Sequence, residues 1–370
     1  MVSSPDSRNV SLFRVFMPPE DVLLPSLRDV LYSGFVSEGE PVYEFERRFG
    51  RYVGSPNVLS FYSGTAALHT ALVLAGVGPG DEVVTTPMTA EPTNLAILHA
   101  GGKVVWADVD PANGNILPAS VAGRITDKTK AVVAVHYGGI PVSLDALSQV
   151  AEENGVPVIE DAAHALGARY GGEVLGSHSA YVVFSLQAIK HLTTVDGGML
   201  TCRDPHDLPH GRSFRWFGID RQQSRTEVDV KTVGYKYHMN NVTATLGLIQ
   251  LEYIEDIVRR HVSNGKYYDM SLQGIPGLDL CTWDAFAEPS YWMYTILADK
   301  ADNLQKKLSE HGIQASKVHK RNDKHTVFAD SLCDLPHLDS FFARMLHIPC
   351  GWWVTDEDRE RIVDCIRRGW

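Results

Sequence analysis

The 370-residue sequence has no paired cysteines, little basic charge and no long apolar run, and each shortage excludes a class of protein. Its five cysteines are scattered and form no C-x-x-C motif, so we expect reduced thiols rather than a disulfide framework or a zinc site. The net charge of −11 at pH 7 argues against a nucleic-acid partner, which would require a basic face. No apolar stretch approaches the about 20 residues that a membrane span needs.

The N-terminus and the histidines add two further expected absences. Residues 1–6 show no basic start followed by an apolar run, so we expect no signal peptide and a soluble, cytoplasmic protein. His206 and His210 have the only spacing that resembles a metal pair. Pro205 and Pro209 argue against a helix there, so we predict a polar loop and no metal site.

Short β-branched runs alternate with helix-like segments from about residue 58 onward. The runs are nearly continuous rather than alternating with polar residues, which is typical of strands buried on both faces of a mainly parallel sheet. They cover residues 57–61, 82–86, 103–107, 131–135 and 156–160. Helical stretches such as 144–154 would supply the crossovers, and the pattern predicts an α/β fold of the doubly wound type.

The pattern changes after Gly234, and the length of the chain favours one large domain plus a smaller one. We predict a large α/β domain over residues 1–250 and a small α+β domain over residues 251–370. One long helix over residues 241–260 is expected to link them. The small domain combines a strand-like run at 294–297 with helices over 303–311 and 356–368.

A small-residue segment, Ser63-Gly64-Thr65-Ala66-Ala67, lies where a predicted strand passes into a helix. Small residues let the backbone approach an anion closely, and the helix N-terminus offers unpaired N–H groups with a favourable dipole. The alternative is that Ser63 only caps the helix, because serine is a preferred N-cap residue. The segment alone leaves both interpretations open.

Asp161 follows a predicted buried strand, at the sheet edge where open α/β folds bind ligands. A carboxylate there can keep a pyridine nitrogen protonated, although Asp161 could instead only cap the next helix. His164, three residues further on, would face the same side of a helical turn. It would either donate to a phenolic oxygen or pack as an ordinary histidine.

Lys190 lies between an apolar run and the glycine pair Gly197-Gly198, with the hydroxyl of Ser185 five residues upstream. Lysine amines react covalently with carbonyl groups when burial or nearby cations lower their pKa. Anion donors, then an acid, then an amine, in this chain order, match the needs of pyridoxal phosphate.

These segments resemble the DegT/DnrJ/EryC1/StrS family of sugar aminotransferases. The resemblance extends to residues 39–46, 234–241 and 348–349, and so spans nearly the whole chain. It implies a fold-type-I transferase dependent on pyridoxal phosphate, with the pyridoxamine form as intermediate. It further implies that Lys190 forms the Schiff base with the cofactor, that Asp161 pairs with the ring nitrogen and that His164 lies near the ring hydroxyl.

The resemblance also implies a homodimer with shared active sites. Gly64, Thr65 and Ser185 would hold the phosphate, and Asn241 would reach it from the partner subunit. Ala90 stands where many relatives place an aromatic residue over the cofactor ring, which leaves His164 or another side chain to cover the ring.

Two further departures affect polar positions near the same site. Residues 235–239 read Tyr-Lys-Tyr-His-Met where Tyr-Asn-Tyr-Arg-Met is commoner. Residues 194–198 read Thr-Val-Asp-Gly-Gly where the family often has Thr-Gly-Glu-Gly-Gly, so the acidic side chain is one carbon shorter.

The implied reaction moves an amino group from an amino acid, expected to be glutamate, to a ketosugar, expected to be nucleotide-linked. Such amino sugars would serve cell-surface polysaccharide or secondary-metabolite biosynthesis. We expect the pKa of Asp161 to be lowered beside a pyridinium charge. Arg221, His319 and Lys320 are candidates for substrate binding, although the segments 216–221 and 319–325 could equally be surface loops.

Three other functions remain alternatives. A sugar dehydratase on the same fold would carry histidine in place of the lysine, and His191 is the neighbour of Lys190. A non-catalytic regulatory or carbohydrate-binding relative would keep the fold without the chemistry. An ordinary amino-acid aminotransferase would need an arginine for the α-carboxylate, which the sequence cannot place.

Overall fold

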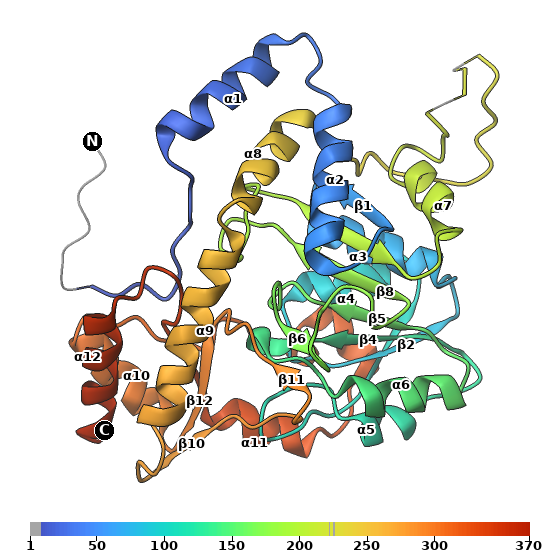
Figure 1. Ribbon diagram of the computed structural model, residues 1–370. Helices are drawn as coiled ribbons and strands as arrows, with labels where there is room; N and C mark the ends of the chain where they lie inside the picture. Colours follow the sequence, from blue (N-terminus) through green and yellow to red (C-terminus); the bar gives the residue numbers. More distant parts are fainter. Residues whose placement is uncertain (1–8, 222, 225) are drawn as a thin grey trace.

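A seven-stranded sheet forms the centre of the larger part of the molecule, in the order β1-β9-β8-β5-β4-β2-β3 (Figure 1). The computed structural model describes residues 9–221, 223–224 and 226–370, so residues 1–6, where we expected no signal peptide, lie outside the described residues. The strands are β1 (Val58–Phe61), β2 (Glu82–Thr85), β3 (Lys103–Trp106), β4 (Thr129–Val135), β5 (Val158–Asp161), β8 (Tyr181–Ser185) and β9 (Gly198–Cys202).

All neighbouring strands of this sheet are parallel except at β9, which runs antiparallel to both β1 and β8. The two faces of the sheet are buried under different helices, as β4 illustrates. Val132 and Ala134 pack with α2 (Glu40–Val53) and α6 (Leu144–Glu153), whereas Ala131 and Val133 pack with α3 (Gly64–Leu74) and α4 (Glu91–His99). The predicted α/β fold with a mainly parallel sheet flanked by helices is confirmed.

A smaller antiparallel sheet, in the order β10-β12-β13, organises the C-terminal part. Its elements are β10 (Leu278–Leu280), β12 (Tyr294–Ala298), β13 (Met345–Ile348), α9 (Ile254–Ser271), α10 (Ala301–Glu310), η2 (Asn322–Lys324), η3 (Thr326–Ser331), α11 (Pro336–Arg344) and α12 (Asp356–Arg367). The N-terminal segment also joins this part, because Val10 forms a parallel bridge with Ile313. The proposed boundary between residues 250 and 251 falls within the last turn of α8 (Asn241–Leu251), before α9 begins, and stays a prediction.

A third sheet, β11-β6-β7, connects the two parts. Here β11 (Ala287–Glu288) pairs with β6 (Arg169–Tyr170), which also pairs with β7 (Glu173–Val174). The remaining helices of the described chain are α1 (Glu20–Tyr32), α5 (Pro118–Ala122), η1 (Tyr137–Gly139), α7 (Asp207–Phe214) and α8 (Asn241–Leu251). Within the described residues, no helix has the length and apolar character needed to cross a membrane.

One predicted helix and one predicted loop are wrong. The single helix over residues 241–260 is interrupted, because α8 ends at Leu251 and α9 begins at Ile254. At the break, the ring of Tyr253 packs against Phe16, and Gln250 Nε2 donates to the carbonyl of Phe16 at 2.9 Å. A contact with the distant N-terminal segment therefore accompanies the break, and this contact could not be read from local periodicity.

The polar loop predicted around His206 and His210 is also wrong, because α7 covers residues 207–214. Pro205 precedes this helix and Pro209 lies in its first turn. The first amide groups of a helix have no intrahelical partner, so a proline there loses no hydrogen bond. Among the described residues, no group of three histidine, cysteine, aspartate or glutamate side chains is placed to hold a metal ion.

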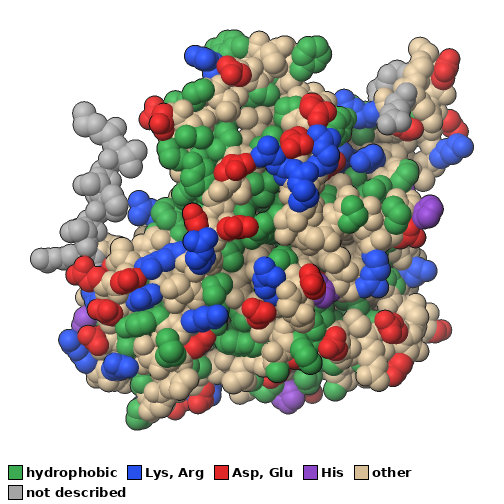
Figure 2. Space-filling model, in the orientation of Figure 1, with side chains coloured by type: hydrophobic (Ala, Val, Ile, Leu, Met, Phe, Trp, Pro, Cys, Tyr) green, Lys and Arg blue, Asp and Glu red, His purple; other side chains and the backbone are tan. Residues whose placement is uncertain are grey.

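The surface over α1 and α2 shows two kinds of patch (Figure 2). Hydrophobic side chains are exposed in the region of α1, where Tyr32 is 86% exposed and Phe35, just beyond the helix, is 80% exposed. Over α2, arginines and glutamates lie together in ion pairs, for example Arg48 with Glu44 at 2.7 Å. An apolar surface of this kind next to a charged one is typical of a protein interface.

Candidate active site

A cavity of about 400 Å³ opens at the carboxyl ends of β5 and β8, beside the N-termini of α3 and α4. The structure gathers there most of the residues proposed from the sequence: Gly64, Thr65, Ala90, Asp161, His164, Ser185, Lys190 and His319. Parallel strands end at one edge of a sheet, so segments far apart in the chain meet at this point.

The N-terminus of α3 forms one wall of the cavity. Ser63 caps this helix, since its Oγ accepts a hydrogen bond from the Ala66 amide at 3.1 Å, so the capping interpretation is correct for Ser63 itself. Gly64 packs on Ser185, and a Cβ on Gly64 would lie 3.1 Å from the Cβ of Ser185. A Cβ on Gly198 would lie 2.4 Å from the carbonyl oxygen of Ser63, so glycine is required for this approach. Amide groups at a helix N-terminus and the Ser185 side chain thus lie together, as an anion site requires.

Asp161 is buried at the end of β5 and accepts two hydrogen bonds. Thr93 Oγ1 donates to Oδ2 at 2.7 Å, and the Ala163 amide donates to Oδ1 at 3.0 Å. Burial raises the pKa of this carboxyl group, and the two hydrogen bonds only partly oppose the effect. The lowered pKa expected from the sequence assumed a neighbouring pyridinium charge; the protein groups alone shift the pKa upward.

Lys190 is only partly accessible, and burial lowers the pKa of its amine to about 7, although the charge of Asp161 acts in the opposite direction. It forms no ion pair with any residue in the described part of the chain. Its Nζ lies 3.8 Å from the centre of the Trp292 ring. A substantial fraction of this amine is therefore neutral, and so nucleophilic, near pH 7.

His164 lies beside the lysine and stacks on Trp292, with 3.9 Å between ring centres and 17° between ring planes. Its Nδ1 is buried without a hydrogen-bond partner among the described residues. Burial, with a smaller contribution from the charge of Lys190, holds the pKa of His164 well below its usual value. His164 is thus a packed neutral histidine that keeps one unused hydrogen-bonding atom.

His191 does not line the cavity, despite its place next to Lys190. It is buried, and its Nε2 contacts the carbonyl oxygen of Ser290 at 3.2 Å. The other histidine that lines the cavity is His319, which comes from the C-terminal part and whose ring plane lies within 3° of that of His164. Burial lowers the pKa of His319 to about 4.

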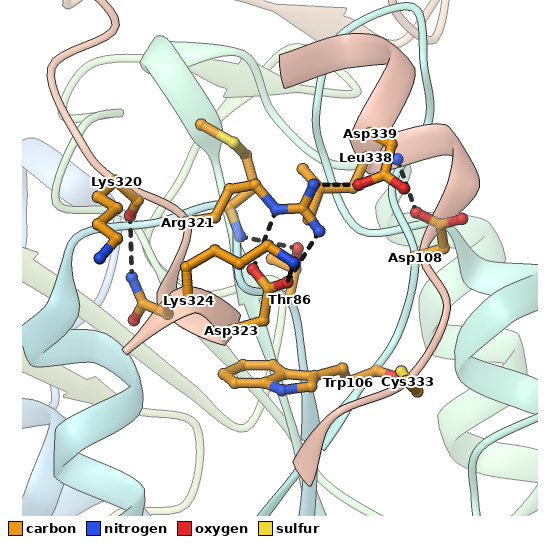
Figure 3. Close-up of polar contacts among 12 residues, drawn as sticks. Thr86, Trp106, Asp108, Lys320, Arg321, Asp323, Lys324, Cys333, Leu338 and Asp339 are labelled. Carbon is orange, nitrogen blue, oxygen red and sulfur yellow. Dashed lines mark hydrogen bonds and ion pairs between the residues drawn. The ribbon is translucent and has the colours of Figure 1, made fainter. Parts of the chain in front are cut away.

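A polar network fixes the segment that carries His319 (Figure 3). Arg321 pairs with Asp323 at 2.8 Å and with Asp339, while Lys324 Nζ lies 3.2 Å from the same Asp323 oxygen. Next to them, Asn322 Nδ2 donates to the carbonyl of Thr89 at 2.9 Å, immediately before Ala90. The segment 319–325 is therefore anchored to the loop that carries Ala90.

Three predicted residues lie outside the cavity of their own chain. Asn241 Nδ2 donates to the carbonyl of Phe35 at 2.7 Å, and Arg221 pairs with Glu38 at 2.5 Å. Lys320 is exposed and points away from the Arg321 network (Figure 3). Their assigned roles stay predictions.

The sequence interpretation missed Thr93 and Trp292. Thr93 lies in α4, one turn from Ala90, and supports Asp161. Trp292 comes from the segment just before β12 and contacts both Lys190 and His164. No motif links Thr93 to Asp161 or Trp292 to Lys190 in the sequence. Thr93 meets Asp161 within the larger part, where α4 packs beside β5, and Trp292 meets Lys190 only where the C-terminal part packs on the larger one.

The chemical groups that line the cavity match those that pyridoxal phosphate requires. The helix N-terminus with Ser185 suits a phosphate, Asp161 suits a ring nitrogen and Lys190 suits the aldehyde. The unused Nδ1 of His164 is a further polar atom of the kind a ring hydroxyl requires. Fold and site together define an aminotransferase dependent on pyridoxal phosphate.

Comparison with known proteins agrees with this class. Residues 20–367 match the model of the DegT/DnrJ/EryC1/StrS aminotransferase family, and the chain belongs to this family. The spore coat polysaccharide biosynthesis protein SpsC of Bacillus subtilis (strain 168) is 32% identical over 362 residues, which cover 93% of each chain.

Solved structures give the same result. The sugar aminotransferase CalS13 from Micromonospora echinospora superposes with a TM-score of 0.94 at 38% identity, over 98% of this chain and 100% of CalS13. The putative sugar aminotransferase Spr1654 from Streptococcus pneumoniae, at 25% identity, has been solved in both PLP and PMP forms; its PLP form has a TM-score of 0.89 over 97% of this chain and 98% of its own. The cofactor is pyridoxal phosphate.

Proposed function

We propose that this enzyme transfers the amino group of glutamate to the keto carbon of a nucleotide-linked sugar, in cell-surface polysaccharide or secondary-metabolite biosynthesis. The observation that carries the proposal is the common cavity of Lys190 and Asp161, an amine with a lowered pKa beside a buried acid. SpsC, whose name places it in polysaccharide biosynthesis, and the sugar aminotransferase CalS13 support a sugar acceptor.

In this proposal each residue of the cavity has a separate role. Pyridoxal phosphate supplies an electron sink that stabilises a carbanion next to its imine. Lys190 would hold the aldehyde covalently, and its free amine would carry a proton from one carbon to another. Asp161 keeps the ring nitrogen protonated, His164 contacts the ring hydroxyl, and Gly64, Thr65 and Ser185 bind the phosphate.

We further propose that two subunits share each site. Of the described residues that line the cavity, none is an arginine, yet an amino-acid carboxylate and a sugar diphosphate both need cations. Arg221 and Asn241, the first residue of α8, line one surface pocket with residues of α1, next to its exposed apolar side chains, so a dimer through this face would bring them to the neighbouring cavity. His319 and Lys320 are proposed to contact the substrate at the other side.

The proposal also bears on where in the cell the enzyme acts and on the dehydratase alternative. A substrate made from nucleotide sugars places the enzyme in the cytoplasm. The dehydratase alternative is not favoured, because His191 points away from the cavity and Lys190 occupies it.

A panel of nucleotide-linked ketosugars tests the proposal directly. The cofactor-loaded protein is first mixed with glutamate, and the loss of absorbance at about 410–430 nm reports amino transfer to the cofactor. Each ketosugar is then added, and the absorbance should return for the accepted sugar. Aspartate and alanine serve as alternative donors. Return of the absorbance with free 2-oxo acids, but with no sugar in the panel, would replace the sugar acceptor by an ordinary amino-acid acceptor.

A further inference from the structure

Trp292 connects the reactive lysine and the histidine of the cavity. Its ring centre lies 3.8 Å from Lys190 Nζ, and the ring of His164 stacks on it at 3.9 Å. Its Nε1 donates to the carbonyl of Ile189 at 2.8 Å, immediately before the lysine. One side chain therefore contacts the amine of Lys190 and also the backbone that carries it.

The orientation of this indole is fixed from several sides. Phe13 of the N-terminal segment stacks on it with 5.1 Å between ring centres. The backbone before and after it is held by the turn at Gly138-Gly139, since the Met293 amide donates to the carbonyl of Gly138 at 3.3 Å. A Cβ on Gly139 would lie 2.7 Å from the Trp292 nitrogen, so the two backbones are in close contact. The ring is thus a rigid surface rather than a mobile neighbour.

Two physical effects compete at the amine of Lys190. Burial favours the neutral amine, and the charge of Asp161, which forms no ion pair with Lys190, only partly opposes this effect. The face of an indole attracts an ammonium group, and indole is the most favourable of the aromatic rings for this contact. The indole therefore provides the stabilisation of positive charge that an ion pair would otherwise provide.

We propose that Trp292 is a positioning residue that holds the free amine of Lys190 against its indole ring and stabilises the protonated form of this amine between two proton transfers. The inference rests on the proposed function, in which Lys190 takes a proton from one carbon and returns it to another. The lysine must carry this proton in the interval, and the amine regains its neutral form when the proton is delivered. The Nε1 hydrogen bond keeps the lysine backbone in register with the ring.

The pH dependence of cofactor capture tests this role without turnover. Pyridoxal phosphate is added to the cofactor-free full-length protein, and the rate of appearance of absorbance at about 410–430 nm is measured from pH 5 to 9. Only the neutral amine reacts, so the pH of half-maximal rate follows the pKa of Lys190. Trp292→Leu should lower this pH by roughly 0.5–1.5 units, and Trp292→Phe by less, because a benzene ring keeps a weaker π face.

Trp353→Leu is a matched control. Trp353 also lies in the C-terminal part and donates its Nε1 to a backbone carbonyl, that of Ser11 at 2.8 Å, but it contacts the ring of His261 rather than a lysine. This variant should keep the wild-type pH dependence. The Phe variant is the milder change, so its comparison with wild type decides the question if the Leu variant does not fold.

The outcomes separate this inference from the proposed function. A half-maximal pH that is unchanged or higher in the Trp292 variants would overturn the role of the indole, even if Lys190 proves essential. Capture at the wild-type rate by Lys190→Ala would instead overturn the assignment of the lysine and, with it, the proposed function.

Discussion

The buried Arg215 and the partly buried Lys190 are two cations with opposite surroundings. Arg215 is almost inaccessible and pairs with Glu46 at 2.7 Å and with Glu38 at 2.8 Å. Burial alone would lower its pKa, but the two carboxylates raise it. Lys190 has no such partners, and its pKa falls to about 7. The contrast distinguishes a structural charge, which the fold satisfies, from a chemical one, which the fold leaves reactive.

The largest expected effect follows the removal of the unpaired cation. Lys190→Ala should abolish the absorbance at about 410–430 nm and lower turnover by at least about a thousandfold, because covalent catalysis and proton transfer are both lost. The protein should remain folded, since no ion pair is broken. Spectroscopy and steady-state kinetics of the purified variant measure both effects, and a persisting band would refute the assignment.

Replacement of Asp161, the acid of the cavity, should lower turnover without lowering the free energy of unfolding. Asp161→Asn keeps the shape of the side chain and its place beside Thr93, but it cannot hold a proton on the ring nitrogen. Turnover should fall by about 10²-fold or more. The free energy of unfolding should not fall, because burial already disfavours the charged carboxylate. Near-normal turnover would remove Asp161 from the mechanism.

The paired cation should show the reverse behaviour. Arg215→Met leaves Glu46 buried without a cation and Glu38 with only the partly exposed Arg221, and it should lower the free energy of unfolding by about 3–5 kcal/mol. Denaturant titration of the cofactor-free protein measures this loss. Adding Glu38→Gln and Glu46→Gln to the same variant should restore much of the stability. A single variant as stable as wild type would show that the cluster is not a structural unit.

The smallest effect is a pH dependence confined to Lys190. Its pKa is lower in the folded chain than the usual 10.5, so the unfolded chain binds more protons between about pH 7 and 10.5. The contribution of Lys190 to stability should therefore rise with pH across this window and be constant below it. The free energy of unfolding of wild type and of Lys190→Met is measured at pH 6 and pH 9. The difference in favour of the Met variant should be larger at pH 6. Equal differences at both pH values would contradict the lowered pKa.

Features that depend on local sequence could be predicted, whereas features that depend on packing between distant segments could not. The strands and the residues at their ends follow from continuous apolar runs and local motifs, and Asp161, Ser185 and Lys190, which these motifs single out, line one cavity in the structure. Trp292 could not be predicted, because its contact with Lys190 depends on packing between two parts of the chain. The break before α9 likewise coincides with a contact to the distant N-terminal segment.

The ion pairs of Arg215 were equally hidden. Arg215 lies 169 residues after Glu46 and 177 residues after Glu38, and no spacing rule pairs it with them. The sequence therefore indicates which residues carry chemistry better than it indicates how their charges are balanced, since the balance is set by tertiary burial.

The most direct measurement of the central claim is chemical trapping. The cofactor-loaded protein is reduced with borohydride, digested, and its peptides are analysed by mass spectrometry. Our account predicts that the cofactor is attached to the peptide that contains Lys190. Attachment to another lysine, or no attachment in a protein that binds the cofactor, would contradict it.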